Sequence, residues 1–139
     1  MPKADLFEVQ LDRARPLLPM AVVVQRQVAS RAAGVAFTAP GEQGRRTLVE
    51  AVAGRGEELV AGRVDPTRYE LPLADEVESL GGEVPPPLDR GGLLSLEALC
   101  RRIDAALLGP DETGGVDIEW AQDAHHVLHV LQARPVTRA

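Results

Sequence analysis

The sequence predicts an α+β fold in which a mostly antiparallel sheet packs against helices. Short valine-rich or alternating segments, separated by turns rich in glycine and proline, indicate strands. One longer segment toward the C-terminus has apolar residues at intervals of three and four, which indicates an amphipathic helix. A chain of 139 residues has room for one hydrophobic core, so we expect a single domain.

The first expected element is a buried strand at Met20–Val28, because the run MAVVVQRQV is rich in valine. Residues 1–19, which precede it, carry mixed charges and prolines. We expect them to form a weakly ordered lead-in, with at most a short helix around residues 4–13.

An antiparallel meander is expected next. GVAFT at Gly34–Thr38 and TLVEAV at Thr47–Val52 predict two strands, and the segment between them, Ala39–Gly44, has the glycine and proline of a turn. Ala29–Ala33 would connect this pair to the preceding strand. Because so short a turn joins the two strands, they are expected to pair antiparallel.

The centre of the chain predicts a short helix, a strand and a long loop. Glu57–Ala61 follows a GRG segment and ends at Gly62, a residue typical of helix C-termini. Such a glycine-flanked start can bind phosphate, but glutamates already occupy its first turn, which favours a structural role. Arg68–Leu71 indicates one more strand, and the proline-rich Pro72–Gly92 indicates a surface loop.

The main helix is expected at Ser95–Leu108, with Ser95 as its N-cap and Gly109 at its end. Its apolar face includes Cys100, the single cysteine of the chain. A reactive thiol needs an exposed, cationic setting, so this position favours core packing.

A final hairpin is expected from VDIEWA at Val116–Ala121 and HVLHVLQA at His126–Ala133. Alternation places Asp117 and Glu119 on one face of the first strand, roughly 7 Å apart. Two carboxylates at this spacing can hold one or two Mg²⁺ ions, which prefer hard oxygen ligands.

The register of this hairpin decides whether Gln132 and Arg134 join the carboxylates. A four-residue loop at Gln122–His125 would place Ala121 opposite His126, and even-numbered residues of the second strand would then share the carboxylate face. A loop of odd length would place them on the other face. The joint surface could hold a metal-bound polyphosphate; the alternative is a solvated strand face with a diagonal Glu–Arg pair.

Composition excludes several other functions. The chain has 15 basic and 21 acidic residues, a net charge of −6, so neither nucleic acid nor an anionic membrane is an expected partner. It shows no membrane-spanning run and no signal-peptide pattern, which predicts a cytoplasmic protein. His125, His126 and His129 are expected in a turn and at a strand edge, without zinc. Lysine chemistry has one candidate, Lys3.

Four segments occur in the order and spacing of a known family: MAVVVQRQVASRAAGVAFT, VEAVAGRGEELVAGRVDPTRY, VDIEWA and VLQARPVT. They resemble the ATP-binding domain of the phosphoenolpyruvate-utilising dikinases, the family of phosphoenolpyruvate synthase (pyruvate, water dikinase), pyruvate phosphate dikinase and rifampicin phosphotransferase. DIEW followed by LQARP is the most specific pair. The family's domain is an ATP-grasp fold with nucleotide between two subdomains, and residues 20–138 resemble the C-terminal one.

The resemblance implies cofactors, ATP and Mg²⁺, and a role for each candidate at the phosphate end. Glu119 and Asp117 would hold Mg²⁺, and Gln132 and Arg134 would contact the phosphates. Glu50 lies in a strand that faces the same cleft in such folds.

The resemblance also implies residues for the base. Gln25 would lie near the exocyclic amine of adenine, and the backbone around Gln27 and Val28 would read the edge of the ring. Val24 and Val35 could line the base, although core packing explains them equally well.

The resemblance implies further parts that this sequence does not contain. The family's phosphate-binding lysine belongs to an N-terminal subdomain, and Lys3 has no such context. The swivelling domain with its phosphorylated histidine and the acceptor-binding domain have no counterpart either. Within the matched segments, Arg55 stands where the family usually has an apolar residue, and Gln27 replaces a common methionine.

Two functional hypotheses follow. In the first, the chain is the Mg·ATP-binding portion of a kinase or phosphotransferase. A protein partner supplies the lysine-bearing subdomain and the phosphohistidine domain. In the second, it is a non-catalytic nucleotide-binding or interaction module, or a truncated remnant. The acceptor substrate, whether pyruvate, an antibiotic or another molecule, has no signature in the sequence.

Overall fold

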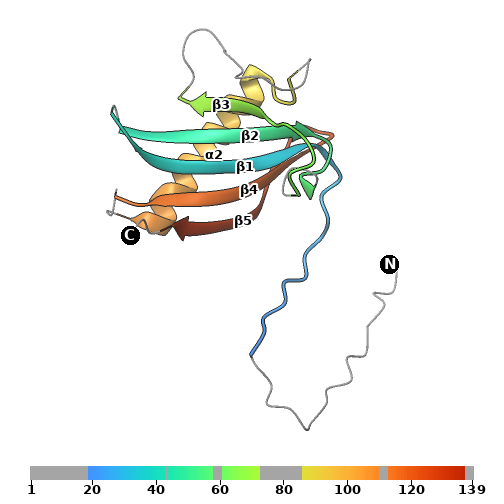
Figure 1. Cartoon of the computed structure of the whole chain (residues 1–139), viewed down its shortest axis with the longest axis horizontal. Coiled ribbons are helices and arrows are strands. Elements are labelled where there is room, and N and C mark those ends of the chain that lie inside the picture. The colour runs from blue at the N-terminus through green and yellow to red at the C-terminus, as the bar shows by residue number, and fades with distance from the viewer. Residues whose placement is uncertain (1–18, 43, 58–60, 73–85, 110–112, 137–139) are drawn as a thin grey trace.

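A computed structural model describes residues 19–42, 44–57, 61–72, 86–109 and 113–136, and shows a five-stranded sheet with one long helix across it in these ranges (Figure 1). All neighbouring strands are antiparallel, in the order β3-β2-β1-β4-β5. The elements are β1 (Ser30–Gly41), β2 (Gly44–Ala53), β3 (Thr67–Leu71), α2 (Arg90–Leu108), β4 (Gly115–Asp123) and β5 (Leu128–Val136). The α+β prediction with a mostly antiparallel sheet is therefore confirmed.

The core lies between one face of the sheet and α2. Burial of apolar side chains on this face drives the packing, at about 25 cal/mol per Å² of surface removed from water. Cys100 is fully buried there, as predicted, and burial raises the pKa of its thiol to about 12. The core residues are Ala32, Ala36, Val49, Ala51, Tyr69, Leu71, Leu88, Leu93, Leu96, Cys100, Val116, Ile118 and Trp120.

Three of the four strands predicted in the first half of the chain form. GVAFT lies in β1, TLVEAV lies in β2 and Arg68–Leu71 lies in β3, with the expected antiparallel pairing of β1 and β2. The connection expected at Ala29–Ala33 is wrong, because β1 already begins at Ser30 and Ala32 pairs with β2. The expected turn at Ala39–Gly44 is also too wide, since both strands extend into it.

The strand expected at Met20–Val28 is wrong. From residue 19 to 29 the chain is extended and belongs to no strand, and Figure 1 shows its N-terminal part running away from the sheet. Met20 is 84% exposed and Val24 is 94% exposed. A valine-rich run is buried only where a neighbouring strand and a covering layer exist, and the described residues provide neither for this segment. The expected lead-in at residues 1–19 lies outside them, except for Pro19.

The main helix begins five residues earlier than predicted. Asp89, not Ser95, is the N-cap: its Oδ1 accepts a hydrogen bond from the Gly92 amide at 2.7 Å. Gly109 ends the helix, as predicted. The sequence does not indicate this earlier helix start, because the two glycines of the first turn have low helix propensity. In the structure a glycine is needed at position 92, because a side chain there would crowd Leu88 and Gln122.

The remaining central predictions are partly within the described residues. Glu57 is helical, the Ala61 amide donates to its carbonyl at 3.0 Å, and Gly62 has the positive φ of a helix C-terminus. Residues 58–60 of the expected helix and residues 73–85 of the expected loop lie outside the described ranges, and the end of that loop belongs to α2. None of the described helices has the length and apolarity of a membrane span.

Candidate functional site

The sheet face opposite α2, called here the open face, carries two rows of side chains that run across all five strands. Residues directly opposite each other on antiparallel strands share a face. From β3 to β5 the first row is Arg68, Glu50, Val35, Glu119 and Gln132, and the second row is Glu70, Leu48, Phe37, Asp117 and Arg134. The four residues predicted for the phosphate end thus lie together, at the β4–β5 side of this face.

The predicted register that brought these residues together is wrong. Ala121 lies opposite His129, not His126, because β4 continues to Asp123 and the turn comes later. Continued from that pairing, the register would put Gln132 opposite Ile118, on the core face. A β-bulge at Leu131 shifts the register by one residue and returns Gln132 to the open face.

The carboxylates of this face differ in their availability. Arg134 Nη2 lies 3.4 Å from Asp117 Oδ2, and Arg68 Nε lies 3.1 Å from Glu50 Oε1. The diagonal Glu–Arg pair of the alternative interpretation is therefore not the one observed, since Arg134 pairs with Asp117, directly opposite it. The Glu119 side chain is exposed and makes no hydrogen bond or ion pair to any residue in the described ranges. Its carboxylate is free to take a ligand.

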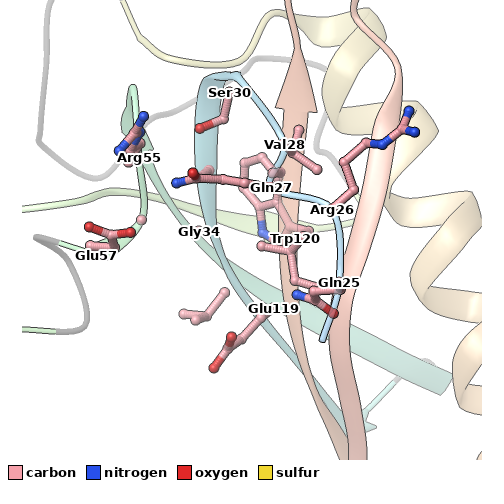
Figure 2. A pocket seen from close by; sticks show the side chains of 15 residues that line it. Gln25, Arg26, Gln27, Val28, Ser30, Gly34, Arg55, Glu57, Glu119 and Trp120 are labelled. Carbon is pink, nitrogen blue, oxygen red and sulfur yellow. The ribbon is translucent and has the colours of Figure 1, made fainter. Parts of the chain in front are cut away.

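A hollow of about 440 Å³ adjoins Glu119 at one end of the open face. Figure 2 shows side chains from the extended segment before β1, from β1, from the loop after β2 and from β4 around it. The lining residues are Gln25, Arg26, Gln27, Val28, Ser30, Ala33, Gly34, Val35, Arg55, Gly56, Glu57, Glu119, Trp120, Ala121 and Leu131.

The hollow is lined by residues from both predicted groups, those expected near the base and those expected at the phosphate end. Gln25, Gln27 and Val28 line it together with Glu119, and Asp117 lies one row further along the same strand. Val35 lines the hollow as expected, whereas Val24 does not and is almost fully exposed.

A second hollow, of about 300 Å³, adjoins the Asp117 end of the open face. Its floor includes Phe37 and Leu48, each a little over one-third exposed, and its rim includes Arg46 and Glu70. The two carboxylates of β4 therefore lie between two concave surfaces, which is a suitable position for a ligand with a charged centre.

Sequence reasoning missed two contributors to the first hollow. Trp120, the only tryptophan of the chain, is 1% exposed, and its indole Nε1 has no hydrogen-bond partner among the described residues. The GRG segment, interpreted as structural, places Arg55 and Glu57 at the rim (Figure 2). Arg55 and Glu57 carry no local signal for this role, because the hollow that they line also requires the extended segment before β1, which the sequence predicts as a strand.

His125 and His129 lie where the sequence predicted them, whereas His126, expected at the start of the second hairpin strand, precedes β5. His125 is in the β4–β5 turn, and His129 is on the edge strand β5, where its Nε2 lies 2.9 Å from Asp123 Oδ2. This contact and nearby backbone amides lower the pKa of Asp123. Within the described residues no group of three or more His, Cys, Asp and Glu side chains is arranged to hold a metal ion.

The carboxylate pair nevertheless suits Mg²⁺ bound together with a substrate. Mg²⁺ is usually held by one or two carboxylates, with waters and substrate phosphates at its other positions. Asp117 and Glu119 supply two such oxygens on one strand face, and Glu119 has no competing partner in the described structure. The donor set fits a shared metal–phosphate site better than a closed structural site.

Comparison with known proteins identifies the family. Residues 9–84 match the family model for the pyruvate phosphate dikinase AMP/ATP-binding domain. The chain belongs to this family. The match covers more than half of the chain and includes the extended segment, β1, β2 and β3.

Relatives extend the similarity over the remaining strands. A phosphoenolpyruvate synthase of Aeropyrum pernix is 42% identical in an alignment that covers 84% of this chain, and a rifampicin phosphotransferase of a Streptomyces species is 38% identical in an alignment that covers 85% of it. A probable phosphoenolpyruvate synthase of Archaeoglobus fulgidus is 29% identical over 98% of this chain. The chain spans only 12%, 16% and 21% of the lengths of these relatives, respectively.

Proposed function

We propose that the chain binds Mg·ATP as the C-terminal half of an ATP-grasp site, within a phosphoenolpyruvate synthase-like dikinase or phosphotransferase. One observation carries the proposal: the unpaired carboxylate of Glu119 lies where the hollow lined by Gln25, Gln27 and Val28 meets the row that contains Gln132. A single ligand with a base at one end and phosphates at the other can contact all of these residues.

The base would occupy the hollow. Its lining is mainly apolar at the floor, with Ala33, Val35 and Ala121, and it is polar along the extended segment, where Gln25 and Gln27 offer amide donors and acceptors. Small ligands are typically bound in this way, on an apolar surface with a few polar groups that fix their orientation.

The phosphates would follow β4 toward Asp117. Bound Mg²⁺ would neutralise phosphate charge there, held by Asp117 and Glu119. Arg134 is two-thirds exposed and paired to Asp117 at 3.4 Å, so its guanidinium can exchange that contact for a bidentate contact to phosphate oxygens. Gln132, directly opposite Glu119, can donate an amide hydrogen to the same phosphates.

Catalysis would need groups from outside this site. In the proposed reaction a phosphoryl group passes from ATP to a histidine on a separate domain or partner protein. That partner also supplies the lysine-bearing subdomain, since the described residues contain no lysine.

The lack of a lysine among the described residues also favours a second candidate function, a non-catalytic nucleotide-binding module. The two differ in one result: only the first transfers phosphate to a histidine when the partner is added.

Calorimetry of the 139-residue chain with Mg·ATP tests the binding site. Glu119→Gln and Arg134→Gln should each weaken binding about tenfold, the scale of one charge-assisted contact. Glu42→Gln and Arg63→Gln are matched controls, because these exposed residues line neither hollow. Absence of Mg·ATP binding, or equal losses in controls and test variants, would refute the site.

A further inference from the structure

The loop that follows β2 is held against the start of β1 by two hydrogen bonds. The Gly54 amide donates to the Arg31 carbonyl at 2.9 Å, and the Ser30 hydroxyl donates to the Gly54 carbonyl at 2.8 Å. Gly54 has a φ of 77°, which glycine adopts without strain. These contacts fix the backbone on which the next residue, Arg55, is carried.

Arg55 lies at the rim of the first hollow with its guanidinium free. It is exposed and makes no ion pair or hydrogen bond with any residue of the described structure. Figure 2 shows it across the hollow from the extended segment that carries Gln25 and Arg26. A planar cation therefore stands opposite the segment proposed to bind the base.

The position of Arg55 separates it from the phosphate end. Its loop is bonded to Arg31, whereas Asp117 and Arg134 lie in the row of Phe37, six residues further along β1. Six residues of a strand span about 20 Å. A nucleotide whose phosphates lie near Arg134 would therefore present its nucleoside end to Arg55.

We propose that Arg55 stacks its guanidinium on the purine ring of the nucleotide and so closes the nucleoside end of the hollow. The inference rests on the proposed function. Arginine is suited to this role because its guanidinium is planar, weakly hydrated and attracted to the face of an aromatic ring. Glu57, at the same rim, offsets the positive charge locally and makes a phosphate contact less favourable there.

Titration with adenosine, AMP and Mg·ATP tests the proposal. The chain has one tryptophan, Trp120, so the NMR signal of its indole N–H is assigned without ambiguity. Because Trp120 lines the hollow, a shift of this signal reports binding there. Arg55→Ala should weaken all three ligands by the same factor, about two- to fivefold. Arg55→Lys should not restore affinity, because a lysine keeps the charge but lacks the plane.

Two further variants make the outcome specific. Arg134→Gln should weaken Mg·ATP but leave adenosine unchanged, and Arg63→Ala, at another exposed arginine outside the hollow, should change none of the ligands. If Arg55→Ala has no effect while Arg134→Gln weakens Mg·ATP, the stacking inference is wrong and the proposed function stands. An Arg55→Ala loss confined to Mg·ATP and rescued by lysine also refutes stacking. If the wild-type chain binds none of the ligands, the proposed function itself is wrong.

Discussion

Replacing Gly34 by alanine is expected to destabilise the chain by about 3 kcal/mol, the upper range for overpacking a core. Gly34 lies in the central strand β1, opposite Ala51 on one side and Trp120 on the other. An added Cβ would lie 1.8 Å from the Glu50 carbonyl oxygen and 3.0 Å from the Trp120 ring. The oxygen belongs to the neighbouring backbone, so it can move away only if the β1–β2 pairing is distorted.

Thermal unfolding of Gly34→Ala should show a midpoint lower by about 10 °C, given the entropy of unfolding of a domain this size. Gly56→Ala is the matched control in the same hollow: its Cβ would lie 3.5 Å from the Ala33 side chain and 3.9 Å from the Gly34 backbone nitrogen, both ordinary contacts. We expect that variant to keep the wild-type midpoint. Equal midpoints for the two variants would show that the close approach at Gly34 does not constrain the sheet.

The elements predicted correctly are those whose signal is local. Alternation along β4 and the three-and-four spacing of α2 depend on side chains within one segment, so they were readable without the rest of the fold. Met20–Val28 has an equally strong local pattern, yet it is exposed and unpaired in the described structure. Strand formation depends on a neighbour, and no local pattern specifies whether that neighbour is present.

The site was predicted in part for a reason that proved incorrect. The assumed four-residue loop between β4 and β5 puts Gln132 on the carboxylate face, and the observed turn alone would put it in the core. The bulge at Leu131 compensates, because each added residue reverses the face. A bulge in an edge strand has no reliable sequence signal. Arg55 was likewise unpredictable as a lining residue, because its position depends on hydrogen bonds to Ser30 and Arg31 across the sheet.

Removing the Asp104 carboxylate is expected to cost about 3 kcal/mol, as for one partner of a largely buried ion pair. Asp104 lies on α2 and accepts two hydrogen bonds from Arg45 on β2, at 2.7 and 2.9 Å, and one from the Thr38 hydroxyl on β1, at 2.5 Å. Thr38 in turn accepts from the Val116 amide of β4 at 2.8 Å. One carboxylate thus connects the helix to three strands, and its loss leaves Arg45 and Thr38 partly buried without it.

The loss should depend on pH in a defined direction. Burial opposes ionisation of Asp104, but its hydrogen bonds from Arg45 and Thr38 and the charge of Arg45 outweigh this, so its pKa lies below the ordinary value. Because its pKa is lowered in the folded state, the Asp104 carboxylate stabilises the fold fully above the unfolded pKa of about 4, and this contribution is lost as the pH falls through the folded pKa.

The free energies of unfolding in urea should therefore differ strongly between wild type and Asp104→Ala at pH 7, and this difference should shrink below pH 4. Arg101→Ala, which removes the exposed partner of an ion pair with Glu97 on the same helix, should cost about 0.5 kcal/mol or less. A difference between wild type and Asp104→Ala that stays constant down to pH 2 would show that the carboxylate acts through packing rather than through its charge.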